Sequence, residues 1–585
     1  MSEQSQQSPG KETVEDVKRS SRHLRGTLAE ELVSGSAGFS ADAAQLLKFH
    51  GVYPQDNRDV RRERTQAKLP LDHICMVRAS VPGGVLTAEQ YLALDEVAGA
   101  VGNGTLRVTT RQGIQFHFAK KQDLATLVGT LNRNLVTTHA ACGDVVRNVT
   151  CCPAPQGGAL REDLVVSARS LAARLKPKSG AYYELWVDGD KVAAPTARGQ
   201  RAAVPESEPL YGDAYLPRKF KIGFAAPGDN CIDVYSHDLG LIPRVDGAEL
   251  VGYTVVVGCG MGAAHADPTT HPSMAVPLAD IDPAELAEVA EAVIGTQRDH
   301  GNREDRQHAR LKYLVEDWGI ERFGAEVERR LGRDLRPASP VAWDGADDHL
   351  GWHPQDPSGD PSGRWWLGVF VENGRIGDFG DRHQRSALRQ IVRRFSPGVR
   401  LTSRQDVLLT DLAGEDRAEV EAVLADHGVP LAEQLSPVAR NAMACPALPT
   451  CGLALGESER VLPAFIAELE AELSGLGLGD QPIHVNMTGC PNGFARPYTA
   501  EVGIVGRTKT AYDLHLGGAR EGTRLAPVLT TSVKRDALVA TLRPLLVAYR
   551  DDRVPGEGFG DWCHRAGIER LRELAGVEAT QRSAA

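Results

Sequence analysis

The stretch Leu106-Arg-Val-Thr-Thr-Arg-Gln112 has a second copy later in the chain, Val399-Arg-Leu-Thr-Ser-Arg-Gln405, at an offset of 293 residues. Two further pairs repeat at the same offset: Arg147-Asn148 with Arg440-Asn441, and Cys152-Pro-Ala154 with Cys445-Pro-Ala447. Separate motifs that keep one offset indicate the duplication of a domain-sized unit and not a short solenoid repeat. Such copies usually pack with pseudo-twofold symmetry, and the contact between them is a natural place for a cofactor.

The sequence around these motifs predicts an α+β fold, with mixed sheets and flanking helices in each copy. Apolar runs typical of strands alternate with helical stretches. The predicted strands are His73–Ala79, Leu106–Thr110, Ile114–Phe118, Tyr182–Val187, Lys219–Phe224 and Val251–Val257. The predicted helices are Ala41–Phe49, Thr87–Val101 and Pro283–Ile294, the second opened by a Thr cap and the third by Pro. We expect residues 73–225 and 366–518 to superpose.

Four segments follow from composition and from the repeat. Residues 1–60 are a polar N-terminal arm, which we expect to be mobile or to depend on a partner. Residues 61–340 hold the first copy and residues 364–585 the second. Residues 341–363 form a linker, because they end in a run rich in Pro, Gly, Ser and Asp.

Composition excludes several classes of protein. The chain has 585 residues, a net charge of −11, 42 % hydrophobic residues and 10 cysteines. An acidic balance argues against nucleic-acid binding, and no apolar run reaches the ~18 residues of a membrane-spanning helix. The polar N-terminus has no signal-peptide core. We expect a cytoplasmic protein, in which ten cysteines serve metal binding or catalysis more readily than disulfides.

The two copies have diverged in opposite directions. At the position equivalent to Cys451 the first copy has Gly158, and at the position equivalent to Arg78 the second copy has Val371. One copy has therefore kept cysteines and the other has kept basic residues. This asymmetry predicts metal chemistry from the second copy and anion binding from the first.

The cysteines of the second copy have the pattern of an iron–sulfur site. Cys445 and Cys451 form a C-x5-C motif, and Cys490 follows 39 residues later. Pro and Gly flank them, and such turns aim backbone N–H groups at sulfur. Zinc fits less well because no CxxC pair occurs. The alternative is that all three are buried apolar thiols.

The basic residues of the first copy predict an anion site. Arg78, Arg111, Arg147, Lys219 and Lys221 fall on predicted strands or just after them. In a Lys-x-Lys pair on a strand both ammonium groups face one side, where they repel each other unless they meet an anion. The alternative is a solvated strand face.

A third basic set, at Arg303, Arg306 and Arg310, has helical spacing. We interpret it as a helical stripe paired with interspersed acidic residues. Elsewhere, Gly258-Cys-Gly-Met-Gly262 lacks the full Rossmann spacing, and no Walker loop, HExxH or G-x-S-x-G occurs. Electrons for a redox reaction would therefore come from a partner protein.

From Phe49 onward the chain resembles the assimilatory hemoproteins of the siroheme and [4Fe-4S] sulfite/nitrite reductase family. The C-x5-C motif and the duplication are part of the resemblance. The other matching motifs are His50-Gly-Val-Tyr53, Pro82-Gly-Gly84, Thr110-Arg-Gln112, Gln115-Phe-His117, Leu216-Pro-Arg-Lys-Phe-Lys221, Thr296-Gln-Arg298, Thr488-Gly-Cys-Pro-Asn-Gly493 and Glu557-Gly-Phe-Gly-Asp561. The resemblance implies six-electron reduction of sulfite to sulfide, with siroheme and a [4Fe-4S] cluster as cofactors. It implies a flavoprotein reductase subunit, linked to NADPH, or a ferredoxin as partner.

The resemblance also implies roles for individual residues. The substrate anion would be held by Arg78, Arg147, Lys219 and Lys221. Siroheme or its carboxylates would contact Arg107, Arg111, Gln115, Arg218 and Asn492, and the cluster would be ligated by Cys445, Cys451 and Cys490. Siroheme nitrite reductases commonly have Asn at the second lysine of the pair, so Lys221 favours sulfite over nitrite.

One position departs from the family pattern. The family loop reads Cys-Pro-Asn-Gly-Cys, and here it reads Cys490-Pro-Asn-Gly-Phe494. The missing thiolate is the one that bridges cluster and siroheme iron in the family. The enzyme could be disabled, Cys151, Cys152 or water could take the position, or the chain could be a non-catalytic siroheme-binding scaffold. Nitrite reduction is the other alternative.

Overall fold

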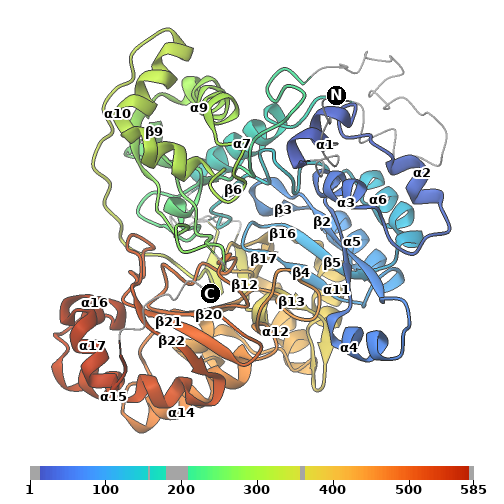
Figure 1. Cartoon of the computed structure of the whole chain (residues 1–585). Coiled ribbons are helices and arrows are strands. Elements are labelled where there is room, and N and C mark those ends of the chain that lie inside the picture. The colour runs from blue at the N-terminus through green and yellow to red at the C-terminus, as the bar shows by residue number, and fades with distance from the viewer. Residues whose placement is uncertain (1–12, 156–157, 180–207, 266, 356–362, 579–585) are drawn as a thin grey trace, which may run out of the picture.

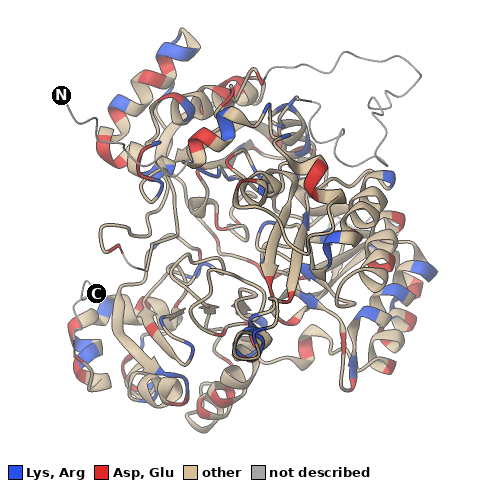
Figure 2. Cartoon of the chain, turned by 45° about the vertical axis from the view of Figure 1, so that its right-hand side comes forward, with Lys and Arg blue, Asp and Glu red and all other residues tan. Residues whose placement is uncertain are grey.

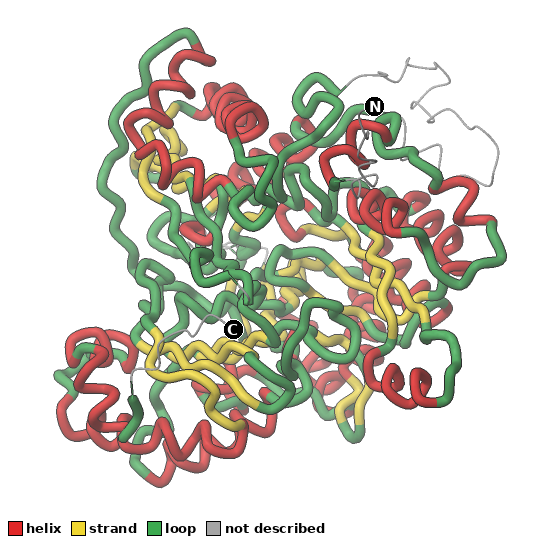
Figure 3. The backbone as a smooth tube through the Cα atoms, in the orientation of Figure 1, coloured by secondary structure: helices red, strands yellow, loops and turns green. Residues whose placement is uncertain are grey.

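The computed structural model describes residues 13–155, 158–179, 208–265, 267–355 and 363–578 (Figure 1). The predicted strand Tyr182–Val187 and residues 356–362 of the predicted linker lie outside these residues. The described strands form four five-stranded sheets and one two-stranded ribbon, β14 (Asp378–Phe379) with β15 (Arg382–His383). The strands gather in the interior and the helices cover them from outside (Figure 3).

Sheets 1 and 2 have the same antiparallel plan. Sheet 1 has the order β1-β2-β5-β4-β13 and sheet 2 the order β11-β12-β17-β16-β3. The strands of sheet 1 are β1 (Val52–Asp56), β2 (His73–Ala79), β4 (Leu106–Val108), β5 (Ile114–Ala119) and β13 (Arg375–Ile376). Those of sheet 2 are β3 (Val85–Leu86), β11 (Gly351–Pro354), β12 (Arg364–Val369), β16 (Gly398–Leu401) and β17 (Val407–Ala413).

The last strand of each sheet comes from the other copy. β13, from the second copy, pairs with β4, and β3, from the first copy, pairs with β16. The registers are equivalent: Ile376 faces Leu106 in one sheet, and Leu86 faces Val399 in the other. The copies therefore exchange a two-residue strand reciprocally, and neither sheet is complete without the other copy.

Sheets 3 and 4 repeat a second, mixed plan. In β6-β7-β8-β9-β10 and in β18-β19-β20-β21-β22 the first three strands are parallel and the last two antiparallel. Sheet 3 contains β6 (Thr150–Cys151), β7 (Ile222–Phe224), β8 (Leu239–Asp246), β9 (Glu249–Val257) and β10 (Val276–Ile281). Sheet 4 contains β18 (Ala442–Ala444), β19 (Val485–Thr488), β20 (Val502–Gly506), β21 (Ala511–Leu516) and β22 (Val528–Lys534). Two matching plans confirm the duplication.

The offset of 293 does not hold throughout. Thr150 pairs with Gly223 in sheet 3, and the equivalent Met443 pairs with Asn486 in sheet 4, so the offset falls to 263 after the insertion that precedes β7. The single superposition expected for residues 73–225 and 366–518 therefore breaks at this insertion.

Two predicted segments have different bounds in the structure. The predicted strand Lys219–Phe224 is observed only from Ile222, and Lys219 and Lys221 lie in the extended segment before it, where Phe220 forms a parallel bridge with Val146. Part of the predicted linker is the strand β11, which pairs with β12 and so belongs to sheet 2.

Helices cover the outer faces of the sheets. They are α1 (Val14–Ser20), α2 (Leu28–Val33), α3 (Ala41–Leu47), α4 (Arg58–Gln66), α5 (Ala88–Ala100), α6 (Leu124–Arg133), α7 (Ala159–Arg174), α9 (Leu286–His300), α10 (Leu311–Leu331), α11 (Gln384–Phe395), α12 (Arg417–Asp426), α13 (Pro437–Arg440), α14 (Leu462–Gly475), α15 (Leu538–Asp552), α16 (Phe559–Ala566) and α17 (Ile568–Ala575). Thr87 caps α5 in a capping box with Gln90, as its sequence predicts. α5 packs on its counterpart α11, where Asp95 pairs with Arg385.

The N-terminal segment departs from the expected mobile arm. From Thr13 it forms helices whose apolar residues join the main core, such as Leu28 and Leu46. Lys18 is fully buried and donates a hydrogen bond to the carbonyl of Leu216 at 2.9 Å. A fully buried lysine needs this partner and its ion pair with Glu15. Residues 13–50 are therefore part of the folded first copy.

The distribution of charged residues and the apolar character of the helices match what the composition predicts. Basic and acidic residues occur side by side on the outer helices (Figure 2). None of the described helices is both long enough and apolar enough to cross a bilayer.

The strand exchange generates a prediction for stability. A Cβ at Gly374 would lie 2.4 Å from the carbonyl oxygen of Val108, across the contact between the copies, and the φ of Gly374 is +72°. Gly380 has a φ of +52° and no neighbouring atom within 4 Å of its Cβ position. We expect Gly374→Ala to destabilise the protein by about 2–4 kcal/mol and Gly380→Ala by about 1 kcal/mol, in chemical unfolding experiments. Equal effects would show that the exchanged strand tolerates displacement.

Candidate functional site

A row of polar side chains crosses sheet 1. Arg78 on β2 faces Gln115 on β5, Gln115 faces Arg107 on β4, and Arg107 faces Arg375 on the exchanged strand β13. At one end, the Gln115 amide oxygen, once the amide is oriented to satisfy both groups, accepts from Arg78 Nε at 3.2 Å. At the other end Glu459 accepts from Arg107 and Arg375, at 3.1 and 2.7 Å. The positive charge is therefore neutralised at the Arg107 end.

A second group of cations lies beyond the Arg78 end. The segment with Arg147 runs parallel to the segment with Lys219 and Lys221, because the backbone N–H of Arg147 donates to the carbonyl of Phe220 at 2.9 Å. The backbone N–H of Phe220 in turn donates to the carbonyl of Val145 at 3.0 Å. This pairing brings together three of the four cations that the resemblance assigns to the substrate anion.

Burial and neighbouring positive charges weaken the protonation of Lys219, Lys221 and Arg111. Burial lowers the pKa of Lys221 to about 7, and the neighbouring Arg310 and Arg111 add to the effect. Burial and Arg310 lower the pKa of Lys219 well below its ordinary value. Burial, with Arg147 next to it, lowers the pKa of Arg111 to about 9. Among the described residues, positive charge at this site therefore exceeds negative charge, and a bound anion would favour the charged forms.

The acidic residues nearby are already paired with other bases. Asp238 accepts from Arg310 at 2.9 Å, and Asp144 pairs with Arg306 at 2.9 Å. Burial lowers the pKa of Arg218 to about 10, with Arg306 as the largest neighbouring charge. Among the described residues, the buried Nε of Arg111 has no hydrogen-bond partner. An unpartnered donor within excess positive charge fits a ligand with several carboxylates, such as siroheme.

The third basic set differs from its prediction. Residues 301–310 form a loop between α9 and α10, and not a helical stripe, because the backbone leaves the helical conformation at Gly301. The three arginines reach distant acids: Arg303 pairs with Glu15, Arg306 with Asp144 and Arg310 with Asp238. Arg310 is therefore a member of the cation group that the spacing did not reveal. Its position just before the apolar start of α10 was the available signal.

The three cysteines of the second copy lie close together around the ends of β18 and β19. The sulfur of Cys445 accepts from Gly489 N–H at 3.3 Å, and that of Cys490 from the Asn492 amide at 3.5 Å. Burial raises the pKa of Cys451, and hydrogen bonds from the backbone N–H groups of Leu453 and Ala454 partly offset this rise. Burial raises the pKa of Cys445 to about 12, so its thiolate forms against a metal and not in the free site.

The spacing of these cysteines suits several metal ions better than one. Among the described residues, they are not a set whose ligand atoms all lie within 4.8 Å of one another, as a single ion requires. α4 holds their loop from outside, since Arg58 donates to the carbonyls of Cys451 and Ala454 at 3.0 and 2.6 Å. Arg107 donates to the carbonyl of Ala444, next to Cys445, at 2.8 Å.

Phe494 joins the cysteine loop to the cations. Its ring lies 5.0 Å from the ammonium nitrogen of Lys219, and its carbonyl accepts from Thr110 at 3.2 Å. Phe494 is partly exposed, at 36 %. The metal site and the anion site, predicted separately from the sequence, are therefore adjacent. An aromatic ring supplies no ligand to iron, so the site offers three protein thiolates.

The remaining predicted residues fall in two places. Cys152 packs against His349, with 3.5 Å between sulfur and Nε2, and Cys151 lies in the main core. Arg107 is buried against Glu459 and the cysteine loop, away from the Arg78 end of the row. The roles assigned to single residues stay predictions.

The comparisons with known proteins agree with this geometry. The family described as "Nitrite and sulphite reductase 4Fe-4S domain" matches residues 142–335 and 437–583, and "Nitrite/Sulfite reductase ferredoxin-like half domain" matches residues 70–134 and 356–427. Each family therefore matches twice, once in each copy.

Curated relatives match almost the whole chain. The sulfite reductase [NADPH] hemoprotein beta-component of Myxococcus xanthus is 44 % identical, over 95 % of this chain and 96 % of its own length. The sulfite reductase [ferredoxin] of Synechococcus elongatus is 44 % identical over 98 % of this chain and 92 % of its own.

A solved structure shares the fold. The NirA protein of Mycobacterium tuberculosis matches with a TM-score of 0.76 at 22 % identity, over 96 % of this chain and 98 % of its own. The duplicated sheets, the paired cation and cysteine sites and the sequence matches lead to one conclusion: the chain belongs to the nitrite and sulphite reductase family.

Proposed function

We propose that this chain reduces sulfite to sulfide, with six electrons, at siroheme held against the buried cations of the first copy. The observation that carries the proposal is the contact of Lys219 with Phe494, because it puts the anion site beside the three-cysteine loop. The names of the relatives support the choice of sulfite, since those with 40 % or more identity include sulfite reductases of both the NADPH and the ferredoxin type.

The cations bind the substrate and hold protons. Sulfite is an anion that becomes more electron-rich at each reduction, so Arg78, Arg147, Lys219 and Lys221 offset its charge. Loss of oxygen as water consumes protons. Lys221, whose pKa burial lowers to about 7, can hold a proton or release it near neutral pH.

Siroheme, when bound, would supply the iron at which sulfite is reduced. Its carboxylates would pair with Arg111 and Arg218, where the described residues leave positive charge uncompensated. The Gln115 amide oxygen accepts a hydrogen bond from Arg78 Nε and so holds the guanidinium in position. Asn492, which the family resemblance places against siroheme, donates its side-chain amide to the sulfur of Cys490 at 3.5 Å.

A [4Fe-4S] cluster would be held by Cys445, Cys451 and Cys490. Three thiolates leave one iron without a protein ligand, because Phe494 lies where the family loop has its last cysteine. The position beside Lys219 makes Phe494 the residue between cluster and anion site. This observation favours the second candidate function, a siroheme-binding scaffold without turnover. Reduction of nitrite at the same cations is the other alternative.

The electron donor in this proposal is a separate protein. The chain contains no Walker or complete Rossmann motif, and its relatives are named for NADPH and for ferredoxin. We propose a flavoprotein reductase subunit or a ferredoxin, in the cytoplasm. A role of residues 1–60 in docking it would use their outer surface, because residues 13–50 already pack on the first copy.

The first test removes charge from the anion site. We expect Lys219→Met and Lys221→Met each to lower kcat/KM for sulfite about 10²–10³-fold, because each removes a cation that the reacting anion contacts. Iron and siroheme content should stay unchanged. The control is Lys509→Met, an exposed lysine in the turn between β20 and β21. The assay is oxidation of reduced methyl viologen with sulfite or nitrite.

Three results would refute parts of this proposal. Unchanged turnover in both lysine variants would remove these residues from the anion site. A higher kcat/KM for nitrite than for sulfite in the unmodified protein would make it a nitrite reductase. Full siroheme occupancy without turnover of either anion would identify the scaffold.

The second test restores the missing thiolate. We expect Phe494→Cys to raise the iron content of the cluster from fewer than four to four per chain, and to produce magnetic coupling between cluster and siroheme in EPR spectra. The control is Phe379→Cys, which adds a thiol at a phenylalanine that is 57 % exposed on β14. Four cluster irons and coupled siroheme before any substitution would show that another group completes the site.

A further inference from the structure

Four ligand-type side chains, three from the first copy and one from the segment before β11, meet apart from the cysteines of the second copy. Cys152 follows β6, Asp229 and Cys231 follow β7, and His349 precedes β11. Their ligand atoms all lie within 4.8 Å of one another. The two thiols and the imidazole are at most 5 % exposed. The elements that carry them come from three separate parts of the chain, so the cluster depends on the tertiary fold.

The distances between these atoms match the edges of a tetrahedron around one ion. With bonds of about 2.3 Å from zinc to sulfur and about 2.0–2.1 Å to nitrogen and oxygen, tetrahedral edges are about 3.6 Å for S···N and S···O and about 3.4 Å for N···O. The observed values are 3.5 Å from Cys152 sulfur to His349 Nε2 and 3.6 Å to Asp229 Oδ2. Asp229 Oδ2 lies 3.3 Å from His349 Nε2.

Two cysteines of this group occupy positions equivalent to those of the cysteine loop in the second copy. Cys152 is equivalent to Cys445 at the offset of 293. Beyond β7 the offset is 263, because Ile222 and Leu239 pair as Val485 and Val502 do. Cys231 is therefore equivalent to Phe494. The first copy has a thiol at the position where the second copy has lost one.

The first copy cannot form the same kind of site. Pro227 stands at the position of Cys490 and Gly158 at that of Cys451, so only two thiols are present. His349 and Asp229 add two ligands at short range. Two thiolates, an imidazole and a carboxylate within tetrahedral distances suit one borderline-soft divalent ion and not a four-iron cluster.

The surroundings hold these ligands in place. Asp229 Oδ1 accepts from the backbone N–H of Cys231 and of Asp347, at 3.0 and 3.1 Å, which leaves Oδ2 to face the other ligands. The backbone N–H of His349 donates to Asp347 Oδ1 at 2.9 Å, and the other ring nitrogen, Nδ1, lies 3.7 Å from Asp347 Oδ2. A carboxylate near the far nitrogen is a common feature of metal-binding histidines. Arg161 donates to the sulfur of Cys152 and would offset its charge.

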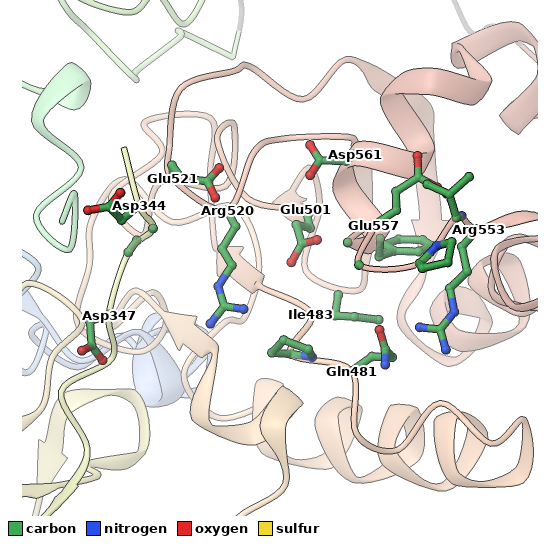
Figure 4. A pocket seen from close by; sticks show the side chains of 18 of the residues that line it. Asp344, Asp347, Gln481, Ile483, Glu501, Arg520, Glu521, Arg553, Glu557 and Asp561 are labelled. Carbon is green, nitrogen blue, oxygen red and sulfur yellow. The ribbon is translucent and has the colours of Figure 1, made fainter. Parts of the chain in front are cut away.

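A cation can approach from a nearby cavity. Asp229 lines a cavity of about 1080 Å³, together with Asp344 and Asp347. Figure 4 shows Asp344 and Asp347 on one side of it and Arg520, Glu501 and Asp561 farther across. More acidic than basic residues line this cavity, so it attracts cations, whereas the anion site of the first copy attracts anions.

We propose that Cys152, Asp229, Cys231 and His349 bind one Zn²⁺ ion, which fixes the loops after β6 and β7 to the segment before β11. The ion is structural, since the four protein ligands complete its tetrahedron. This site is independent of sulfite reduction and of the iron–sulfur cluster.

Metal analysis and Co²⁺ substitution test the site. We expect purified protein to contain one zinc per chain in addition to its iron. Zinc X-ray absorption should show two sulfur and two nitrogen or oxygen ligands. After removal of zinc under reducing conditions, one Co²⁺ should bind with thiolate charge-transfer bands. Cys231→Ser and His349→Gln should each weaken Co²⁺ binding at least 100-fold, while Cys563→Ser, at another buried free thiol, should not change it.

Several results would overturn the proposal. They are the absence of both zinc and Co²⁺ binding, a Cys152–Cys231 disulfide in the purified protein, and a ligand set of three sulfurs. A Co²⁺ spectrum that Cys451→Ser abolishes and Cys231→Ser leaves intact would place the ion in the cluster site instead. The X-ray absorption result decides the question even where a variant fails to fold.

Discussion

Buried positive charge is the constraint on which this structure depends. Lys219, Lys221, Arg111 and Arg147 are brought together in the first copy while the nearest carboxylates pair with other bases. Burying like charges without a counterion is costly, and the lowered pKa values of both lysines and of Arg111 express that cost. In the function that we propose, an anionic cofactor and an anionic substrate supply the missing charge.

The duplication explains how one chain forms two different sites side by side. Each copy contributes a sheet whose last strand belongs to the other, so the copies cannot separate without breaking both sheets. Glu459 of the second copy neutralises Arg107 and Arg375 at this contact, which leaves the Arg78 end of the row positive. Divergence then left the three-cysteine loop in the second copy and the cation group in the first, and Lys219 meets Phe494 where the two sites adjoin.

The sequence predicted what is local or repeated. The capped helix after Thr87 and most strands follow from periodicity and capping, and the repeat predicted two equivalent copies. The strand exchange was not predictable, because each two-residue strand pairs with a partner far away in the sequence, 270 residues for Ile376 with Leu106 and 313 for Leu86 with Val399. Arg303, Arg306 and Arg310 have helical spacing, and the helix predicted from it is wrong. The three arginines lie in a loop, and each pairs with an acid that is distant in the sequence. His349 and Cys231 gave no signal, since only the fold brings them together.

The pH dependence of the unfolding free energy, measured on the protein without siroheme, tests most directly whether burial and mutual repulsion disfavour the charged forms of these cations. Lys221 has a folded-state pKa of about 7, against an ordinary value of 10.5. Above pH 7 the folded chain has released a proton that the unfolded chain retains, so stability rises with pH relative to a variant without this lysine. The difference in unfolding free energy between wild type and Lys221→Met should shift by about 2 kcal/mol in favour of wild type between pH 7 and pH 9. A difference that does not change with pH would contradict the account.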